Sequence, residues 1–439
     1  MDAIGRKAKT LWWLGVGLFA AGLAGLAACA VNPVTGQQEL VLMSEQQELA
    51  MGARYFPQTT QINNALPPED PQLQGYVSGL GRRLAAASHR PGIPWEFNVV
   101  NSSQVNAYAL PGGKISFTRG LLTKLRSEDE LASVAGHEIG HVTARHSVAQ
   151  YTNRALISLA VVGVAAALSD SKYGELGVAA AGAAGGLLLL GYSRDQERQA
   201  DELGYAYLTQ NGYNPRGTVE VFRMFKAQEK EEPGFIAAML SSHPLTGERI
   251  ETAQRRAQTG PAHLIGQPLR VEPYQRALAR QMDRAPAYQA MDQGDLLAGK
   301  ERLDQAQAQY QRAIALYPRE GLFHARLALA RLRQNQPQAA LEPARMGARL
   351  SPQVFMPLFV EGITSYKLED YRQAAASLEK ADALLPEHAG CKLFLGGSYE
   401  KLGNRAQAAQ AYRQVAIADK GELGRAARAR LMALGYKLN

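Results

Sequence analysis

Apolar residues recur every three to four positions along most of the chain, which predicts a largely helical protein with few strands. The clearest helix covers 127–146. Ser127 is placed to cap its N-terminus, and Glu130 is expected to reach back to the cap amide. Its apolar positions fall on one face: Leu131, Val134, Ala135 and Val142. This segment is the first candidate for a buried central helix.

Shorter elements precede this helix. The pattern predicts helices over 44–53 and 73–84 and a strand over 95–100. Two further short strands are expected about the Pro-Gly-Gly turn within 106–118. The N-terminal part of the chain is therefore expected to be mostly helical with a small sheet.

The C-terminal part repeats itself. Pro318, Pro352 and Pro386 follow one another at intervals of 34 residues, the period of the tetratricopeptide repeat. Packing residues recur before each proline: Ala306, Tyr310 and Ala313, then Ala340, Ala344 and Gly347, then Ala374, Leu378 and Ala381. We expect about four helix pairs and a capping helix, stacked as an all-α solenoid whose concave side binds peptides or partner proteins. An unrelated helical bundle would not repeat at equal intervals.

The N-terminus has the layout of a bacterial export signal, with basic residues before the apolar run 11–28. Its end, Leu-Ala-Ala-Cys, resembles the lipobox of bacterial lipoproteins, which implies cleavage before Cys29 and lipidation of that residue. Because Ala30 is not the aspartate associated with inner-membrane retention, the resemblance implies attachment to the outer membrane, facing the periplasm. An uncleaved membrane anchor is the alternative.

Charge and cysteine content narrow the partners. The chain of 439 residues carries a formal net charge of +8, with basic residues spread through both halves, so no nucleic-acid partner is expected. The two cysteines are Cys29 and Cys391. If Cys29 is acylated, no intramolecular disulfide can form, and Cys391 is expected to be a small buried residue of a repeat helix.

The central helix also carries the pattern His-Glu-x-x-His. His137 and His141 lie about 40° apart around the helix, so both can bind one zinc ion. Glu138 lies beside them, in position to act as a general base on water. Downstream, Glu197 and Asp201 share a face of a predicted helix, and Glu197 would complete the three protein ligands of a catalytic zinc. Taken alone, each segment is also compatible with a helix that carries solvated or packed charges.

Two neighbouring residues have open roles. Asp201 is expected to accept a hydrogen bond from the far nitrogen of a zinc-binding histidine, or to orient a cation such as Arg194 or Arg198. His146 could support the site from behind or cap the helix.

Four segments in order, NAYALPGG, HEIGHVTARH, SRDQERQAD and SSHPLTGERI, resemble the zinc metallopeptidases of bacteria and organelles that include HtpX, the CAAX prenyl endoprotease and BepA. The resemblance covers residues 44 to about 256. It implies one Zn²⁺ per chain, with the ligands His137, His141 and Glu197 and the base Glu138. The implied fold is an α+β zincin-like metalloprotease domain, mostly helical with a small sheet, followed by the all-α tetratricopeptide solenoid.

The resemblance also singles out His243 as a residue close to the cleft. His243 could polarise the scissile carbonyl, stabilise the oxyanion or occupy the open zinc position in a resting state. The alternative is a loop histidine with no part in the chemistry. Arg249 is expected to fix the same segment through a buried ion pair.

In peptidases of this type, a sheet edge beside the zinc helix binds the substrate as an added strand. The candidate edge consists of Asn106, Ala107, Tyr108 and Ala109. A hairpin that only packs against the helix is equally compatible with these residues.

The domain assignment follows. We assign 1–28 to the signal peptide, 29–260 to the protease domain, 261–285 to a linker and 286–439 to the repeat array. Within the protease domain, the Ala/Gly-rich apolar runs 155–168 and 176–190 are each shorter than a spanning helix. Buried helices, a lid over the cleft, and a surface that touches membrane or unfolded protein all remain open for these two runs.

These expectations combine into a periplasmic zinc endopeptidase, attached to the outer membrane, that degrades misfolded or stalled envelope and outer-membrane proteins. The expected partners are unfolded or misassembled outer-membrane proteins, the outer-membrane assembly machinery through the array groove, and the membrane through the lipid. The main alternative is a chaperone or scaffold for outer-membrane protein assembly with latent protease activity. A membrane-embedded protease that uses the two apolar runs as spans is a third possibility.

Overall fold

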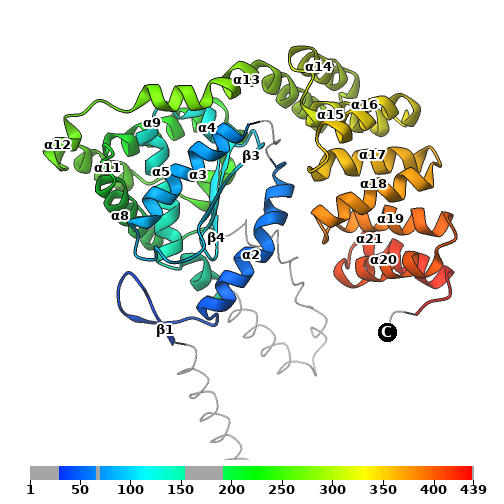
Figure 1. Ribbon diagram of the computed structural model, residues 1–439, viewed down its shortest axis with the longest axis horizontal. Coiled ribbons are helices and arrows are strands. Elements are labelled where there is room, and N and C mark those ends of the chain that lie inside the picture. The colour runs from blue at the N-terminus through cyan, green and yellow to red at the C-terminus, as the bar shows by residue number, and fades with distance from the viewer. Residues whose placement is uncertain (1–28, 66–69, 154–190, 438–439) are drawn as a thin grey trace, which may run out of the picture.

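The computed structural model describes residues 29–65, 70–153 and 191–437 (Figure 1). The expected signal peptide and the two apolar runs lie outside the described residues. No helix among the described residues is long and apolar enough to cross a membrane. The structure forms two lobes, a mixed N-terminal lobe and a curved C-terminal array of helices, and α13 runs from one into the other (Figure 1).

A three-stranded sheet lies within the N-terminal lobe. Its strands occur in the order β3 (Glu96–Val100), β5 (Lys114–Thr118), β4 (Ala107–Leu110), with β3 parallel and β4 antiparallel to the central β5. The expected pair of strands about the Pro-Gly-Gly turn is thereby confirmed. The sheet leaves β4 as one of its two edges.

Helices pack around this sheet. Both α3 (Pro71–Ala86) and α5 (Glu128–Thr143) contact the sheet and one another, while α2 (Glu45–Ile62) packs against β5 and lies between the sheet and the array (Figure 1). The core between them is apolar, with Leu73, Val77 and Leu80 of α3 packed in one cluster with Ile115 and Phe117 of β5. Further helices of the lobe that the structure describes over their full length are α4 (Arg119–Lys124), α8 (Arg194–Gln210), α9 (Arg216–Glu231), α10 (Pro233–Ser242), α11 (Gly247–Thr259) and α12 (Ala262–Ile265).

The range 261–285, which the sequence assigns to a linker, is helical over most of its length. It contains α12 and the first half of α13 (Val271–Gly299), which continues into the array without a break. Pro273 lies in the first turn of α13, where its missing N–H has no intrahelical partner to lose. The prolines in this range therefore do not prevent a helix, and the two lobes are joined by a helix of 29 residues.

The C-terminal array consists of the expected stacked helix pairs, so the solenoid fold is confirmed. The pairs after α13 are built from α14 (Leu303–Leu316), α15 (Gly321–Arg333), α16 (Pro337–Leu350), α17 (Phe355–Lys367), α18 (Tyr371–Leu384), α19 (Ala389–Lys401) and α20 (Arg405–Ala418), with α21 (Glu422–Ala433) at the end. The repeated small residues have a direct packing role. A Cβ on Gly294 would lie 2.5 Å from the ring of Tyr310, and one on Gly396 would lie 2.8 Å from the ring of Tyr412.

A buried polar network joins the two lobes. The guanidinium of Arg119 lies 3.7 Å from the ring centroid of Tyr288, and its Nε donates to Asn101 Oδ1 at 2.9 Å. Tyr288 in turn donates its hydroxyl hydrogen to Glu320 at 2.7 Å. Since Asn101 and Arg119 belong to the N-terminal lobe and the other two residues to the array, this network fixes their relative position.

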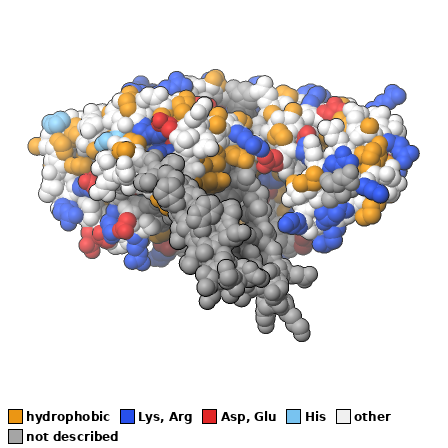
Figure 2. Space-filling view, turned by 90° about the horizontal axis from the view of Figure 1, so that it is seen from below, with side chains coloured by type: hydrophobic (Ala, Val, Ile, Leu, Met, Phe, Trp, Pro, Cys, Tyr) orange, Lys and Arg blue, Asp and Glu red, His pale blue; other side chains and the backbone are white. Residues whose placement is uncertain are grey.

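The surface carries both charges. Seen from below, Figure 2 shows Lys and Arg side chains scattered over both lobes among acidic and apolar ones. The first β-hairpin, β1 (Cys29–Val31) with β2 (Gln38–Leu40), lies at the lower end of the N-terminal lobe in Figure 1.

Candidate metal centre

The central helix α5 begins at the expected cap. Ser127 Oγ accepts a hydrogen bond from the Glu130 N–H at 3.2 Å. The carboxylate of Glu130 accepts from the N–H of Arg126 at 2.8 Å, one residue earlier than the cap amide that the sequence suggested. This helix is buried along its whole length, so its histidines face other helices and not solvent.

A close helix crossing brings α8 to α5. Gly136 and Gly140 of α5 face Ala200 and Gly204 of α8, and a Cβ added to Gly204 would lie 2.9 Å from the backbone nitrogen of His137. Small residues on both helices allow their backbones to touch. As a result, Glu197, in the first turn of α8, reaches the histidines of α5.

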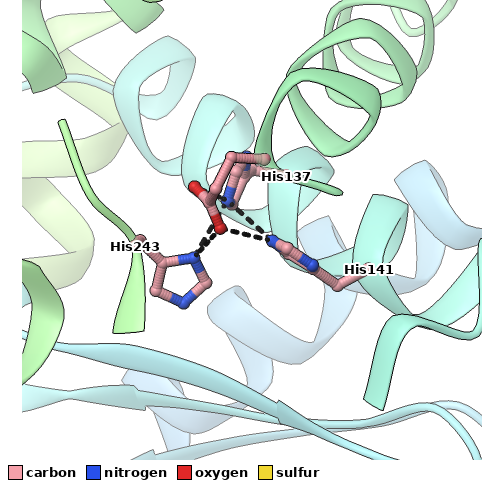
Figure 3. Close-up of side chains that lie close together, drawn as sticks. His137, His141 and His243 are labelled. Carbon is pink, nitrogen blue, oxygen red and sulfur yellow. Dashed lines mark hydrogen bonds and ion pairs between the residues drawn. The ribbon is translucent and has the colours of Figure 1, made fainter. Parts of the chain in front are cut away.

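Three histidine rings surround one carboxylate (Figure 3). His137 Nε2 lies 3.0 Å from His141 Nε2 and 3.6 Å from Glu197 Oε2, and His141 Nε2 lies 3.2 Å from Glu197 Oε1. His243 Nδ1 lies 2.9 Å from Glu197 Oε1 and 3.2 Å from His137 Nε2. The structure therefore brings the three expected ligand residues together and adds His243 to them.

The chemistry of these donors fits a zinc ion. Four potential ligand atoms, from His137, His141, Glu197 and His243, all lie within 4.8 Å of one another, and the four residues are buried. Ligands of a tetrahedral zinc at 2.0–2.1 Å are separated by about 3.3 Å, which is within the range of the distances above. Two ring nitrogens that face each other at 3.0 Å also need a shared cation or proton between them.

Glu138 lies beside this cluster and has no hydrogen-bond partner for its carboxylate among the described residues. Its side chain is fully buried. Burial raises the pKa of this carboxyl above its usual value. A general base needs a carboxylate oxygen that is free of hydrogen bonds and lies beside the metal-ligating side chains, so that it can accept a proton from water.

Asp201 supports the cluster from behind His137. Its Oδ1 lies 2.9 Å from His137 Nδ1, so the opposite nitrogen of that ring is directed at the cluster. The cation beside Asp201 is Arg249, whose Nε lies 2.6 Å from Asp201 Oδ2 and whose Nη1 lies 2.5 Å from Glu197 Oε2. Burial raises the pKa of Asp201, but His137 and Arg249 outweigh it and hold this pKa below its usual value.

Of the two cations that the sequence offered for Asp201, Arg194 and Arg198, the second makes other contacts. Arg198 pairs with Asp195 and Glu248 at the surface. Arg198 pairs with Asp195 because residues three apart on α8 lie side by side on the helix surface. Arg249 reaches Asp201 from a different helix, α11. The buried ion pair expected of Arg249 is present in the structure.

A chain of hydrogen bonds orients His141 through His146, in the supporting role that the sequence left open for it, and through Gln199, which the sequence did not reveal. His146 Nε2 lies 2.8 Å from Gln199 Oε1, an acceptor, so His146 donates there and accepts at Nδ1, which lies 2.9 Å from His141 Nδ1. Burial lowers the pKa of His146 to about 4, which keeps it neutral and able to accept. His141 then presents its Nε2 lone pair to the cluster. Tyr192 stacks on the His141 ring at 3.7 Å and was not anticipated either.

His243 is the residue directly after α10, and the end of that helix sets its position. Its N–H donates to the Met239 carbonyl at 2.8 Å, and Arg249 Nη1 donates to the Pro244 carbonyl at 2.9 Å. Its Nε2 lies 3.7 Å from Glu138 Oε1. The His243 ring therefore lies between Glu138 and Glu197. This position is compatible with a His243 side chain that occupies the open zinc position in a resting state.

The candidate substrate edge lies on β4. Ala107, Tyr108 and Ala109 belong to this edge strand, and Asn106 immediately precedes it. The hydroxyl of Tyr108 accepts from Asn63 Nδ2 at 3.1 Å, and Asn106 Oδ1 is buried without a hydrogen-bond partner among the described residues. α5 packs directly against β4, so the edge and the metal-binding helix are neighbours.

A His-Glu-x-x-His helix, a glutamate from a second helix and a small sheet beside them define a zincin-like metallopeptidase. The family model described as Peptidase family M48 matches residues 71–257. The chain belongs to this family of zinc-dependent peptidases, as the resemblance of its motifs implied.

Three relatives illustrate the match. Metalloprotease YcaL of Escherichia coli is 30% identical, over 43% of this chain and 74% of its own length. The beta-barrel assembly-enhancing protease of Yersinia pestis is 30% identical, over 54% of this chain and 49% of its own length. The mitochondrial metalloendopeptidase OMA1 of Schizosaccharomyces pombe is 33% identical, over 40% of this chain and 50% of its own length. The chain thus spans about half the length of the latter two relatives.

Proposed function

We propose that this chain is a zinc metalloendopeptidase of the bacterial periplasm, attached to the outer membrane through Cys29, that degrades misfolded or stalled outer-membrane proteins. One observation carries the peptidase activity. Glu138 is buried beside a cluster of three histidines and Glu197, and its carboxylate oxygens have no hydrogen-bond partner among the described residues. The peptidase family of the chain supports the same activity.

His137, His141 and Glu197 would hold the zinc ion. When bound, zinc supplies a Lewis acid that polarises a peptide carbonyl and acidifies water. Glu138 takes the proton of the attacking water at a carboxylate oxygen and later gives it to the leaving amine. Asp201 and Gln199 act indirectly, since they fix which nitrogen of each zinc-binding histidine faces the cluster.

The proposed mechanism gives the His243 ring one position in the free enzyme and another when substrate is bound. Its Nδ1 lies at hydrogen-bond distance from Glu197, so the free enzyme holds the ring inside the ligand cluster. Binding of a substrate carbonyl at the same place requires the ring to turn aside, where its N–H can donate to the developing oxyanion. His243 follows the last turn of α10, and we propose that its ring moves by rotation about its side-chain bonds.

An apolar pocket opens beside His137. It lies between α5, α8, α9 and α10, and its apolar walls are Val134, Val221, Phe222, Phe225, Met239 and Leu245. We propose that this pocket, which His137 and His243 also line, receives one substrate side chain next to the scissile bond. An apolar residue there is expected, which fits segments of outer-membrane proteins that are exposed only before they fold.

The repeat array supplies the second half of the proposed function. Stacked helix pairs of this kind form an extended concave surface, which we assign to binding clients or components of the outer-membrane assembly machinery. The name of the Yersinia relative, an enhancer of beta-barrel assembly, supports this choice of partner. The lipid on Cys29 would keep the enzyme at the membrane where these proteins assemble.

A single substitution tests the peptidase activity. Glu138→Gln removes the base but none of the ligands, so it should abolish cleavage of an unfolded outer-membrane protein while the zinc content remains one per chain. Glu202→Gln, an exposed change one residue after Asp201, is the matched control and should cleave normally. Equal cleavage by both variants would contradict the proposal. Full rescue of outer-membrane assembly in cells by the Glu138→Gln variant would instead favour the chaperone function.

A further inference from the structure

The first hairpin has two faces of different character. β1 and β2 pair antiparallel, with Cys29 opposite Leu40 and Val31 opposite Gln38. Residues that face one another across such a pair lie on the same side, and successive residues alternate. The register therefore places Val31, Leu40 and, two residues further on, Leu42 on one side of the hairpin.

The other side of the hairpin is attached to the protein. Asn32 is buried, and its Nδ2 donates to Glu39 Oε1 at 2.8 Å and to the Ala144 carbonyl at 3.4 Å, at the end of α5. Val41 and Met43 are buried in a small cluster with Val148. These contacts hold the hairpin in a fixed orientation on the N-terminal lobe.

The outer side carries these three apolar side chains and one exposed polar residue, Gln38 opposite Val31, and the described residues leave it uncovered. Val31 is 57% exposed, Leu40 48% and Leu42 41%. Tyr151, 42% exposed, directly precedes Thr152, whose Oγ1 accepts a hydrogen bond from the N–H of Leu42 at 3.1 Å. These four are among only 13 large apolar side chains that are exposed in the described residues. Three of the four lie on this hairpin or directly after it, which indicates a surface that is covered in the cell.

The low charge of this segment indicates what covers it. Between positions 29 and 43 the only charged side chain is Glu39, and its carboxylate accepts from Asn32. Entry into the interface of a lipid bilayer disfavours unpaired charges and favours exposed branched apolar side chains. Position 29, opposite Leu40, is also where acyl chains would leave the polypeptide.

We propose that Val31, Leu40, Leu42 and Tyr151 form a membrane-docking face that enters the headgroup region of the bilayer to which Cys29 is anchored. This inference rests on the proposed lipid anchor. With the face in the bilayer, the hairpin orients the whole molecule, since α13 lies at the opposite end of the N-terminal lobe (Figure 1). The enzyme would then stand on the membrane in one orientation and would not swing freely on its lipid.

A site-specific probe tests the docking face. The full chain, lipidated at Cys29, is prepared as Leu40→Cys or Met282→Cys, labelled with an environment-sensitive fluorophore and reconstituted in vesicles of phosphatidylethanolamine and phosphatidylglycerol. Met282 on α13 is 51% exposed, close to the 48% of Leu40, and is the matched control. Cys391 is fully buried and does not compete for the label.

Lipids with a nitroxide near the headgroup should reduce the emission at position 40 about twofold and leave position 282 unchanged, because docked side chains enter only the headgroup boundary. Leu42→Cys should behave as position 40. If the protein floats with the vesicles but the fluorophore at position 40 is not quenched, the docking face is refuted and the lipid anchor is not. Failure of the lipidated chain to float with the vesicles would overturn the anchor and the docking face together, and neither result bears on cleavage by Glu138.

Discussion

The crossing of α5 and α8 leads to a testable consequence for Gly204. A Cβ at this position would lie 2.9 Å from the backbone nitrogen of His137 and 3.0 Å from the carbonyl carbon of Gly136, whereas ordinary contacts begin at 3.4 Å. Gly204→Ala must therefore separate the two helices by about 0.5 Å, and overpacking of this kind costs about 1–3 kcal/mol. The higher helix propensity of alanine offsets about 0.5–1 kcal/mol of this cost.

The same displacement acts on the metal centre, because Glu197 is on α8 and the two histidines are on α5. Ligand distances of a zinc site tolerate deviations of about 0.2 Å, so a shift of about 0.5 Å should weaken zinc binding about tenfold or more. We expect Gly204→Ala to be less stable by about 0–2.5 kcal/mol in denaturant unfolding. Competition with a chromophoric chelator measures the affinity for zinc.

Gly75 provides the matched control for this substitution. It lies within the helix α3, and a Cβ there would meet no atom within 4 Å. Gly75→Ala should therefore stabilise the protein by about 0.5–1 kcal/mol and leave zinc affinity unchanged. If Gly204→Ala bound zinc as tightly as the wild type and matched Gly75→Ala in stability, the close crossing would not position the ligands.

Three further predictions concern other groups. Asp201→Asn should weaken zinc binding about 10- to 100-fold in the same competition assay, because the amide no longer holds His137 in the required orientation, and an unchanged affinity would contradict this role. Burial raises the pKa of the Cys391 thiol to about 12, so a thiol reagent at about pH 8 should react with it only in denaturant, and rapid reaction of the folded protein would refute its burial. Burial also raises the pKa of Glu320 above its usual value despite the nearby Arg119. The protonated carboxyl therefore stabilises the folded protein fully at pH values below the unfolded-state pKa. This stabilisation is lost as the pH rises through the raised pKa of the folded state. The difference in unfolding free energy between the wild type and Glu320→Gln should therefore change between about pH 4 and about pH 8 in favour of the variant, and a constant difference would show that this carboxyl does not titrate on folding.

Local patterns were sufficient for much of the fold. The capped central helix, the strands about the Pro-Gly-Gly turn and the repeat helices all follow from periodicity and turn residues within one segment. The spacing of His137 and His141 needed only helix geometry to place both rings on one side. These features depend on neighbours in sequence, so the sequence alone predicts them.

Features that depend on helix packing were less accessible. Arg249 could not be chosen over Arg194 or Arg198 as the partner of Asp201, because that choice depends on how α11 packs against α8. Gln199 is one of several polar residues on α8, and only the folded arrangement shows that it sets the tautomer of His146. A signal for the close crossing was present in the small residues of α5 and α8, but their partners in space could not be read from one sequence.

The buried polar network between the two lobes could not be predicted from the sequence either. Asn101 and Arg119 directly follow strands β3 and β5, while Tyr288 lies on α13 and Glu320 caps the start of α15. Each is an ordinary polar residue within its own segment, yet Glu320 is 2% exposed and Arg119 is 5% exposed in the joined structure. Buried charges are costly to separate from their partners, so this network disfavours other orientations of the array more strongly than apolar contacts of similar area would. The continuous helix α13 sets the distance between the lobes, and these four side chains set the angle.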